Sequence, residues 1–380
     1  MTDNRDLHDN YTANTTMALD IITVSKLVSN CIWRFVPPVL FVLGTFGNLL
    51  SIYVLNRSDK TSTLINLSAL AVCDLFALYS GLGREWIIHV FKYDIRDFSD
   101  VFCKLHFYSV TFSLQFSSWI LVAITIERVI SVQRPHMAKL ECTKMFALTV
   151  LCTESLVLLV LDGHLLYGFS LTHNNATTFS NGSANESNYS LKLKCQPSQV
   201  NEQYARFVYY VWTWIDFGVA FLLPFVILLT CNVLIVVNIK QSQRFQRVAT
   251  SKNARTSLNS QKPVLSLTAI LLTLNSVFFI CVGPANIFLI GQFYWWPYDV
   301  SNEYDEAIME LVWAVVGILM YSNNAVNFIL YIFCGSQFRA EVKCLLLKIC
   351  GKSTRILPRR RQFACHALTI NISYKQTSSC

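Results

Sequence analysis

The stretch LHFYSVTFSLQFSSWILVAITIERVISV, residues 105–132, decides the fold of this protein. From Leu105 to Ile126 it contains no Asp, Glu, Lys or Arg, and its first charged residues are Glu127 and Arg128. The hydrocarbon core of a bilayer is about 30 Å thick, and a helix of about 20 mostly apolar residues crosses it. Backbone polar groups inside lipid must be satisfied within the segment, so this stretch predicts a membrane-spanning helix.

Six similar windows lie on either side of residues 105–132. They are Phe35–Leu55, Leu64–Val90, Met145–Phe169, Phe207–Ile239, Val264–Phe293 and Ile308–Phe333. Charged residues make up only 14% of the 380 residues, against about 25% in soluble domains. The short alternating segments of a membrane β-barrel are not seen in the sequence. We therefore expect an all-α integral membrane protein with a bundle of seven transmembrane helices.

Basic residues collect in the loops on one side of the predicted membrane. The loop between the fifth and sixth windows and the segment after the seventh are rich in Lys and Arg, and Arg134, Lys139 and Lys144 follow residues 105–132. Acidic residues such as Asp94 and Glu303 lie on the other side. Short cytoplasmic loops carry the excess of Lys and Arg, so the N-terminus is expected to be extracellular. The net charge of +8 is thus explained by membrane orientation rather than by binding to nucleic acid.

Four regions follow from this topology. We expect an extracellular glycosylated arm at 1–32, the seven-helix bundle at 33–334, an amphipathic juxtamembrane helix at 335–350 and a cytoplasmic tail at 351–380. The arm lacks the charged-then-apolar pattern of a cleaved signal peptide, so the first window is expected to act as the membrane anchor. The juxtamembrane helix has an apolar stripe made of Phe338, Val342, Leu345, Leu346 and Ile349.

Glycosylation acceptor sequences cluster in two segments of the predicted outer side. They begin at Asn10, Asn14, Asn175, Asn181, Asn185 and Asn188. Asn-rich polar segments also produce this motif by chance, and Asn56, Asn66 and Asn371 match it on the inside or within a window. The clustering favours at least one attached glycan.

Two pairs of the 13 cysteines suggest covalent chemistry. Cys103 and Cys195 both face the oxidising side, where a disulfide is chemically allowed and would pin the glycosylated loop over the bundle. Cys344 and Cys350 lie in the amphipathic stretch and are candidates for palmitoylation. The zinc-binding spacings of Cys and His do not occur.

The predicted spans carry polar and proline motifs in a fixed order. These are Gly47-Asn48, Asn66 through Asp74, Cys103, Glu127-Arg128, Pro224, Phe278-x-x-Cys281-x-x-Pro284 and Asn327-Phe-Ile-Leu-Tyr331. In this order on seven spans they resemble the rhodopsin-like (class A) G-protein-coupled receptors, over roughly residues 33–350. A single Glu-Arg pair is common, whereas the whole series is specific.

Several positions depart from the pattern of that family. Val282 replaces a usual Trp, Phe328 replaces the Pro that normally follows Asn327, and Val129 replaces an aromatic residue. Asn232 stands where Tyr is common, and the fourth span has no Trp. The resemblance is therefore to a divergent member, most similar in character to a neuropeptide receptor.

The resemblance implies activation of a heterotrimeric G protein by outward movement of the cytoplasmic end of the sixth helix. The residues that it implies for coupling are Glu127, Arg128, Phe278, Pro284, Asn327 and Tyr331. Arg128 can bond Glu127 and also point into the bundle, although a juxtamembrane Arg also commonly snorkels toward water. Proline in a helix removes a backbone hydrogen bond and bends it, which suits a moving sixth helix at Pro284.

A second polar group is expected at mid-depth. Asn323, Asn327 and Tyr331 are four residues apart and share one helical face. With Asn48, Asp74 and Ser117 on other helices they form a predicted polar network. The resemblance implies an allosteric sodium ion at Asp74, and the alternative is a hydrated hydrogen-bond network without an ion. We expect no other metal, no cofactor and no catalytic residues.

The outer third of the spans is expected to hold the ligand. Val110 stands where amine receptors carry an Asp, and Ile308–Phe333 lacks the Lys that opsins need. Charged, amide and aromatic side chains are the candidates for the pocket: Arg84, Glu85, Asp216, Asn286, Gln292, Trp313 and Tyr321. Carboxylates with aromatic rings suit a basic or amidated peptide.

The function favoured by the sequence is a plasma-membrane receptor for an extracellular peptide, with a G protein, arrestin and membrane lipids as partners. A receptor for a lipid or another small molecule is the first alternative. A transporter, a channel and an intramembrane enzyme are less favoured, because inverted repeats, pore-lining repeats and paired catalytic residues are not found in the sequence.

Overall fold

The computed structural model describes most of the chain. The described residues are 3–56, 61–173, 193–197, 202–249, 254–294, 302–334 and, singly, 338, 339, 342, 343 and 345. Asn175, Asn181, Asn185, Asn188, Cys344 and Cys350 lie outside them, as does most of the predicted amphipathic helix. Asn10, Asn14 and Tyr331 lie in described helices, but their side chains are outside the description.

Seven helical segments of the described chain are long and apolar enough to cross a membrane, which confirms the predicted fold class. The first three are α1 (Asp3–Leu55), then α2 (Ser62–Ala77) continued by a π-helical turn (Leu78–Leu82) into α3 (Gly83–Phe91), and then α4 (Asp100–Gln133). The fourth is α6 (Lys144–Asp162) with α7 (His164–Gly168). The fifth contains α8 (Glu202–Phe207), α9 (Thr213–Phe217) and α10 (Leu223–Ala249), joined by the π-helical turns Val208–Trp212 and Gly218–Leu222. The last two are α11 (Ala254–Tyr294) and α12 (Glu303–Cys334).

Hydroxyl side chains start several of these helices. Ser99 accepts a hydrogen bond from the Phe102 backbone N–H at 3.1 Å, and Thr143 accepts one from the Phe146 N–H at 3.2 Å. The first N–H groups of a helix have no partner within the helix, so such caps define where it begins. α4 and α6 therefore begin where the sequence supplies Ser or Thr before an apolar run. The short helix α5 (Pro135–Glu141) lies between them.

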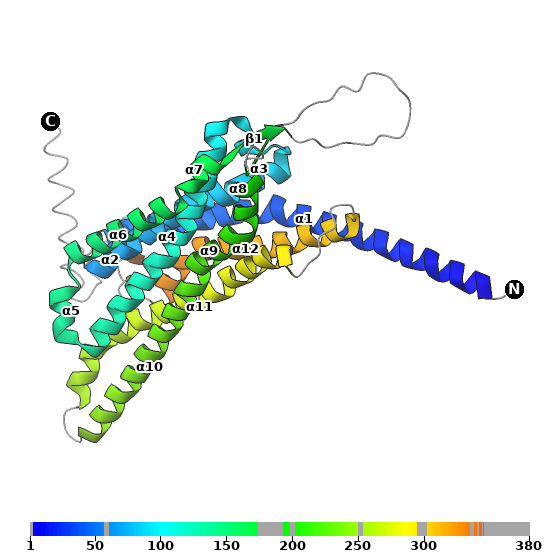
Figure 1. Ribbon diagram of the computed structural model, residues 1–380. Coiled ribbons are helices and arrows are strands. Elements are labelled where there is room, and N and C mark those ends of the chain that lie inside the picture. The colour runs from blue at the N-terminus through cyan, green and yellow to red at the C-terminus, as the bar shows by residue number, and fades with distance from the viewer. Residues whose placement is uncertain are drawn as a thin grey trace.

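A two-stranded hairpin covers one end of the bundle (Figure 1). β1 (Phe169–His173) pairs antiparallel with β2 (Leu193–Pro197), and Leu171 lies opposite Cys195. Cys195 forms a disulfide with Cys103 at the start of α4, which agrees with the pairing expected from the sequence. We call this end of the bundle the disulfide end and the opposite end the Arg128 end.

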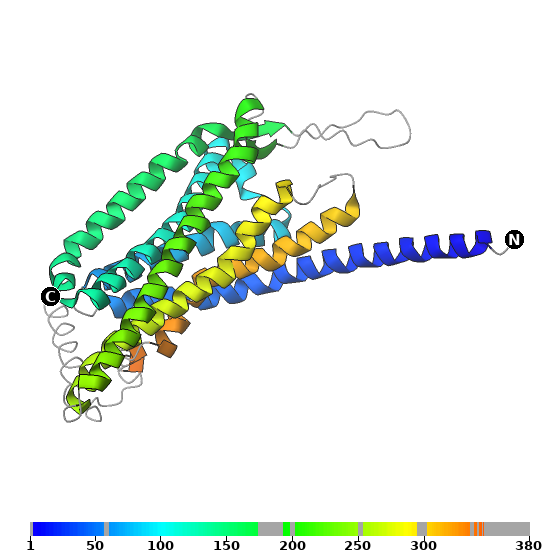
Figure 2. The same cartoon turned by 60° about the horizontal axis from the view of Figure 1, so that its bottom comes forward.

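Helix α4 runs through the middle of the bundle and contacts α2, α6 and α10 (Figure 2). Its Ile120 and Ile124 are completely buried, and they belong to one apolar core with Leu274 and Phe278 of α11. A second core near the disulfide end contains Trp33. Burying these side chains together positions the polar residues that lie between the helices.

Helix α1 is longer than the window Phe35–Leu55 predicts. It begins at Asp3, includes Pro37 and Pro38, and projects beyond the other helices in Figure 1. Trp33, just before that window, is completely buried. The first part of α1 is rich in polar residues, so hydropathy did not predict that it continues the same helix. Hydropathy detects the apolar span and not the full length of a helix.

Helix α12 is continuous through Phe328, the position where Pro is usual. Phe328 is buried and meets Phe46 edge-on, with ring centroids 6.3 Å apart. A Cβ atom on Gly47 would overlap the Phe328 ring. Gly47 thus provides the space into which the larger Phe328 side chain packs, and α1 and α12 approach closely there.

The substitution Gly47→Ala should destabilise the protein by about 1–3 kcal/mol, because the added methyl group overpacks the contact with Phe328. The measurement is the thermal midpoint of the purified protein in detergent. Gly218→Ala is the matched control, since a Cβ atom there meets nothing within 4 Å. The double variant Gly47→Ala, Phe328→Leu should recover most of the loss. Equal midpoints for the two alanine variants would contradict this packing.

Candidate functional site

A cavity of about 490 Å³ lies between the helices at the disulfide end. Residues from α4, α9, α11 and α12 line it, together with β2 of the hairpin. It contains all of the predicted pocket residues: Arg84, Glu85, Asp216, Asn286, Gln292, Trp313 and Tyr321. The structure brings them together, and their contact with a ligand stays a prediction.

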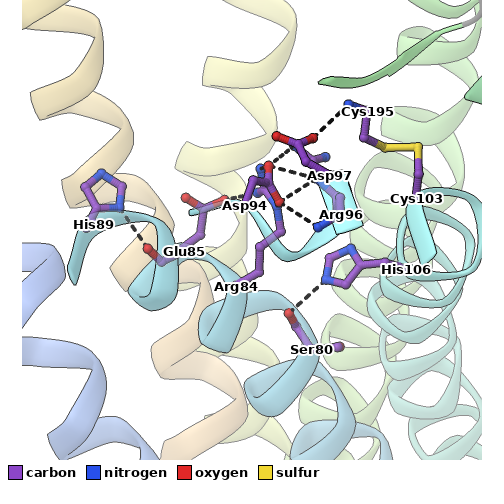
Figure 3. A network of polar contacts seen from close by, with 10 residues as sticks. All are labelled: Ser80, Arg84, Glu85, His89, Asp94, Arg96, Asp97, Cys103, His106 and Cys195. Carbon is purple, nitrogen blue, oxygen red and sulfur yellow. Dashed lines mark hydrogen bonds and ion pairs between the residues drawn. A yellow bond between two sulfur atoms is a disulfide. The ribbon is translucent and has the colours of Figure 1, made fainter. Parts of the chain in front are cut away.

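Arg84, Glu85 and Arg96 form one wall of this cavity, which we call the upper wall. Its charged groups are paired with one another and with Asp94 (Figure 3). Arg84 Nη1 lies 2.6 Å from Glu85 Oε1, and Arg84 Nη2 lies 2.6 Å from Asp94 Oδ2. Arg96 also pairs with Asp94, at 2.8 Å. Glu85 therefore already has a cation as its partner, which limits its attraction for a ligand cation.

Asp94 is the centre of this charged group. Burial alone would raise the pKa of Asp94, but the hydrogen bonds and positive charges of Arg84 and Arg96 hold that pKa well below its ordinary value. Asp94 also caps the short 3₁₀ helix Ile95–Phe98 by accepting the Arg96 backbone N–H at 3.0 Å. Asp94 thus stays ionised and fixes both arginines.

Two neighbouring carboxylates tie the hairpin to the bundle. Asp97 Oδ1 accepts the Cys195 N–H at 2.9 Å, and Asp100 Oδ1 accepts the Leu171 N–H at 3.1 Å. Figure 3 shows Asp97 beside the Cys103–Cys195 disulfide. These contacts hold β1 and β2 over the cavity. Sequence reasoning missed them, because each joins residues about 70 or more apart that share no motif.

The part of the cavity wall at Asp216, which we call the lower wall, carries a carboxyl group without a basic partner among the described residues. Asp216 of α9 accepts a hydrogen bond from Gln115 Nε2 at 2.8 Å, and the same nitrogen lies 3.2 Å from Asp162 Oδ1. Within the described ranges, no ion pair includes either aspartate. Gln115 and Asp162 were not predicted as site residues.

The predicted mid-depth network is present with one correction. Asp74 accepts hydrogen bonds from Asn324 Nδ2 at 2.9 Å and from Asn327 Nδ2 at 2.5 Å, and also bonds Ser117. Asn48 Nδ2 donates to the Asn324 carbonyl at 2.9 Å. The partner is therefore Asn324 and not the predicted Asn323, although both asparagines line the cavity. Helical spacing places both asparagines near Asp74, and only the rotation of α12 selects between them.

A sodium ion at Asp74 stays a prediction. Asp74 and Ser117 supply oxygen atoms of the kind that a hard cation prefers. In the structure the carboxylate is already satisfied by amide and hydroxyl donors. Sodium binding would have to displace or rearrange at least part of this network.

Glu127 and Arg128 are held mainly by α2 rather than by each other. Glu127 accepts hydrogen bonds from Ser62, from Thr63 at 3.0 Å and from Asn66 at 3.0 Å. Arg128 Nη2 donates to Thr63 Oγ1 at 2.9 Å. The expected bond between Glu127 and Arg128 is not among the contacts of the described residues. Thr63 therefore links the two residues.

Neutral side chains join α11 to its neighbours. Asn275 Nδ2 donates to Thr125 Oγ1 at 3.2 Å and to Asn232 Oδ1 at 2.9 Å. Asn232 is the residue that departs from the usual Tyr, and here it bonds the sixth span directly. Phe278 is buried one turn further along α11 and packs near Phe221 of the fifth span, with ring centroids 6.0 Å apart. Pro284 lies in the next part of the same helix.

The fold and these motifs place the chain in a known class of membrane protein. Residues 47–331 match the family described as 7 transmembrane receptor (rhodopsin family), and the chain belongs to that family. Its members are receptors and not enzymes, and they are multi-pass membrane proteins.

Known members of this family show modest identity to the chain. Neuromedin-U receptor 2 of Rattus norvegicus is 26% identical over 323 residues, which cover 82% of this chain and 74% of that protein. The B2 bradykinin receptor of Homo sapiens is 25% identical over 319 residues, covering 83% and 74%. G-protein coupled estrogen receptor 1 of Danio rerio is 24% identical over 349 residues, covering 89% and 84%.

The substitution Asp94→Asn should destabilise the disulfide end by about 2 kcal/mol near neutral pH, since it leaves two partly buried arginines without their shared carboxylate. The lowered pKa means that the stabilisation is complete above the ordinary Asp value of about 4 and disappears as pH falls through the folded value. The thermal midpoints of wild type and variant should therefore differ at pH 7 and converge in acid.

The control is Glu202→Gln, which breaks the exposed ion pair with Arg206 and should change little. A gap between wild type and Asp94→Asn that stays constant from pH 7 down to strongly acidic pH would contradict this role of Asp94.

Proposed function

We propose that the protein is a plasma-membrane receptor for an extracellular peptide with a cationic group, and that it activates a heterotrimeric G protein. The disulfide end would face outward, together with the N-terminus. Family membership and the names of two relatives, a neuromedin-U receptor and a bradykinin receptor, support a peptide ligand.

The observation that carries the proposal is the uncompensated Asp216 in the wall of the cavity. The arginines of the cavity wall have carboxylate partners, whereas Asp216 has only an amide partner within the described part of the chain. Aromatic side chains including Phe107, Phe169 and Trp212 line the same cavity. A basic side chain of a peptide would satisfy the carboxylate while its apolar groups contact these rings.

The Arg128 end is the proposed surface for the G protein. Outward movement of α11 would have to break the bonds from Asn275 to Thr125 and Asn232, and these cost less to break than a buried ion pair. Arg128 would then lose its hydrogen bond to Thr63 and contact the G protein instead. Basic residues in the last part of α10, such as Lys240 and Arg244, would contact the G protein, arrestin and acidic lipids.

A receptor for a lipid or another small molecule is the second candidate. The walls of the cavity are largely apolar, and one relative is named an estrogen receptor. A volume of about 490 Å³ also accommodates a drug-sized molecule.

The test is a screen of synthetic basic and amidated peptides, with steroids and fatty acids in parallel, on cells that express the full chain. The readout is nucleotide exchange on co-expressed G proteins, and ion flux is recorded as well. Arg128→Ala should abolish exchange while the active peptide still binds. Activation by a lipid with no active peptide would favour the second candidate. Ion flux without nucleotide exchange would contradict both.

The orientation is tested with an epitope tag placed at each end of the chain. The tag at the N-terminus should be stained on intact cells, and the tag at the C-terminus only after permeabilisation. Staining of both tags on intact cells would contradict seven crossings.

The substitution Thr63→Val should raise ligand-independent nucleotide exchange several-fold, because it removes the hydroxyl group that holds Arg128. One hydrogen bond to a charged group is worth about 1.5–3 kcal/mol, which is enough to shift a two-state equilibrium about tenfold. The control is Thr230→Val, whose exposed hydroxyl bonds only its own helix at Val226. Basal exchange equal to wild type in Thr63→Val, at matched surface expression, would contradict the restraining role of Thr63.

A further inference from the structure

Gln115, Asp162 and the partly buried Asp216 form a polar cluster at the lower wall of the cavity, which we call the dicarboxylate cluster. They come from three separate spans, on α4, at the last residue of α6 and on α9. Gln115 Nε2 is shared between Asp162 Oδ1 at 3.2 Å and Asp216 Oδ1 at 2.8 Å. Gln115 and Asp162 have no exposed surface.

The cluster has more acceptors than donors. Gln115 Oε1 and Asp162 Oδ2 are buried and have no hydrogen-bond partner among the described residues. Two carboxyl groups share a single amide NH₂ group, and in a medium of low polarity two negative charges this close are unfavourable unless a proton or a cation joins them. A buried acceptor without a donor also loses the hydrogen bonds that water would supply. Both deficits are removed by one positively charged hydrogen-bond donor.

A hydrogen-bond donor on a molecule in the cavity can reach the cluster. Asp216 lines the cavity directly, whereas Asp162 lies behind it and is not part of the lining. The other charged residues of the lining, Arg84, Glu85 and Arg96, are already compensated by one another and by Asp94. A ligand cation therefore finds its strongest uncompensated attraction at Asp216 and not at Glu85.

We propose that the dicarboxylate cluster is the recognition site for a single organic cation of the ligand, a guanidinium or a primary ammonium group. Asp216 bonds this cation directly. Asp162 is a positioning residue: it orients Gln115 and adds a second negative charge behind Asp216. This assignment rests on the proposed function and adds to it the place and the chemistry of the ligand contact.

The test uses the purified full-length protein and three small probes: N-acetyl-arginine amide, N-acetyl-lysine amide and the neutral N-acetyl-citrulline amide. The readout is the thermal midpoint at pH 7.4 and fixed ionic strength. At least one cationic probe near saturation should raise the midpoint by about 3 °C, and the citrulline probe should not. Glu85→Gln should keep this rise, because Glu85 lines another part of the cavity, is paired with Arg84 and does not belong to the dicarboxylate cluster.

Asp216→Asn and Asp162→Asn should each lose most of the rise. Each should also have a higher midpoint than wild type before the probe is added, because the new amide supplies a hydrogen-bond donor that the cluster lacks. A purely structural carboxylate would give a lower midpoint instead, so this sign separates the two roles. Asp20→Asn at an exposed carboxylate is the matched control and should change neither value.

Equal shifts from charged and neutral probes would overturn the proposal. So would a rise that disappears in Glu85→Gln but survives in Asp216→Asn, since the cation would then bind at the upper wall. A full rise in Asp162→Asn would overturn the three-residue site. These measurements need neither the natural ligand nor a G protein, so their outcome is independent of the screen that tests the proposed function.

Discussion

The inability of lipid to offer hydrogen bonds constrains this whole structure. The backbone meets the constraint by forming helices, but polar side chains within the spans must find partners on other helices. The bundle therefore contains a series of polar contacts between spans: Gln115 with two aspartates, Asp74 with α12, Asn275 with α4 and α10, and Glu127 with α2. Arg84 instead pairs with Asp94 in the segment that connects two spans. The apolar cores lie between them.

These contacts differ in how completely they are satisfied, and this difference is related to function. Asp94 and Asp74 each have several donors, so they hold the structure together. The dicarboxylate cluster has too few donors and borders a cavity, and this is why we propose it as a binding site. At the other end, Asn275 bonds the neutral Thr125 and Asn232, and Thr63 bonds Glu127 and Arg128. The same constraint thus produces polar contacts that differ in their number of hydrogen-bond donors and in the charge of their partners.

The sequence predicted the pocket residues better than it predicted their partners. Each predicted residue was found at the cavity, because helical spacing places the outer third of every span near one mouth. The ion pair of Arg84 with Asp94 was not predicted, because Asp94 lies in a connecting segment. Such a segment has no regular repeat from which the position of a side chain could be inferred. Asn324 was missed in favour of Asn323 because neighbouring residues on a helix differ by about 100° in direction, and composition does not report the rotation of a helix.

The sequence by itself determined the class of fold, the family and the positions of the seven spans, because these depend on long apolar runs and on motifs in a fixed order. Only the tertiary structure decided that Gln115 joins Asp162 to Asp216, that Gly47 makes room for Phe328, and that Thr63 holds both Glu127 and Arg128. Such contacts depend on how far each helix is rotated and shifted against its neighbours. That arrangement is set by packing summed over the whole bundle, and no local pattern encodes it.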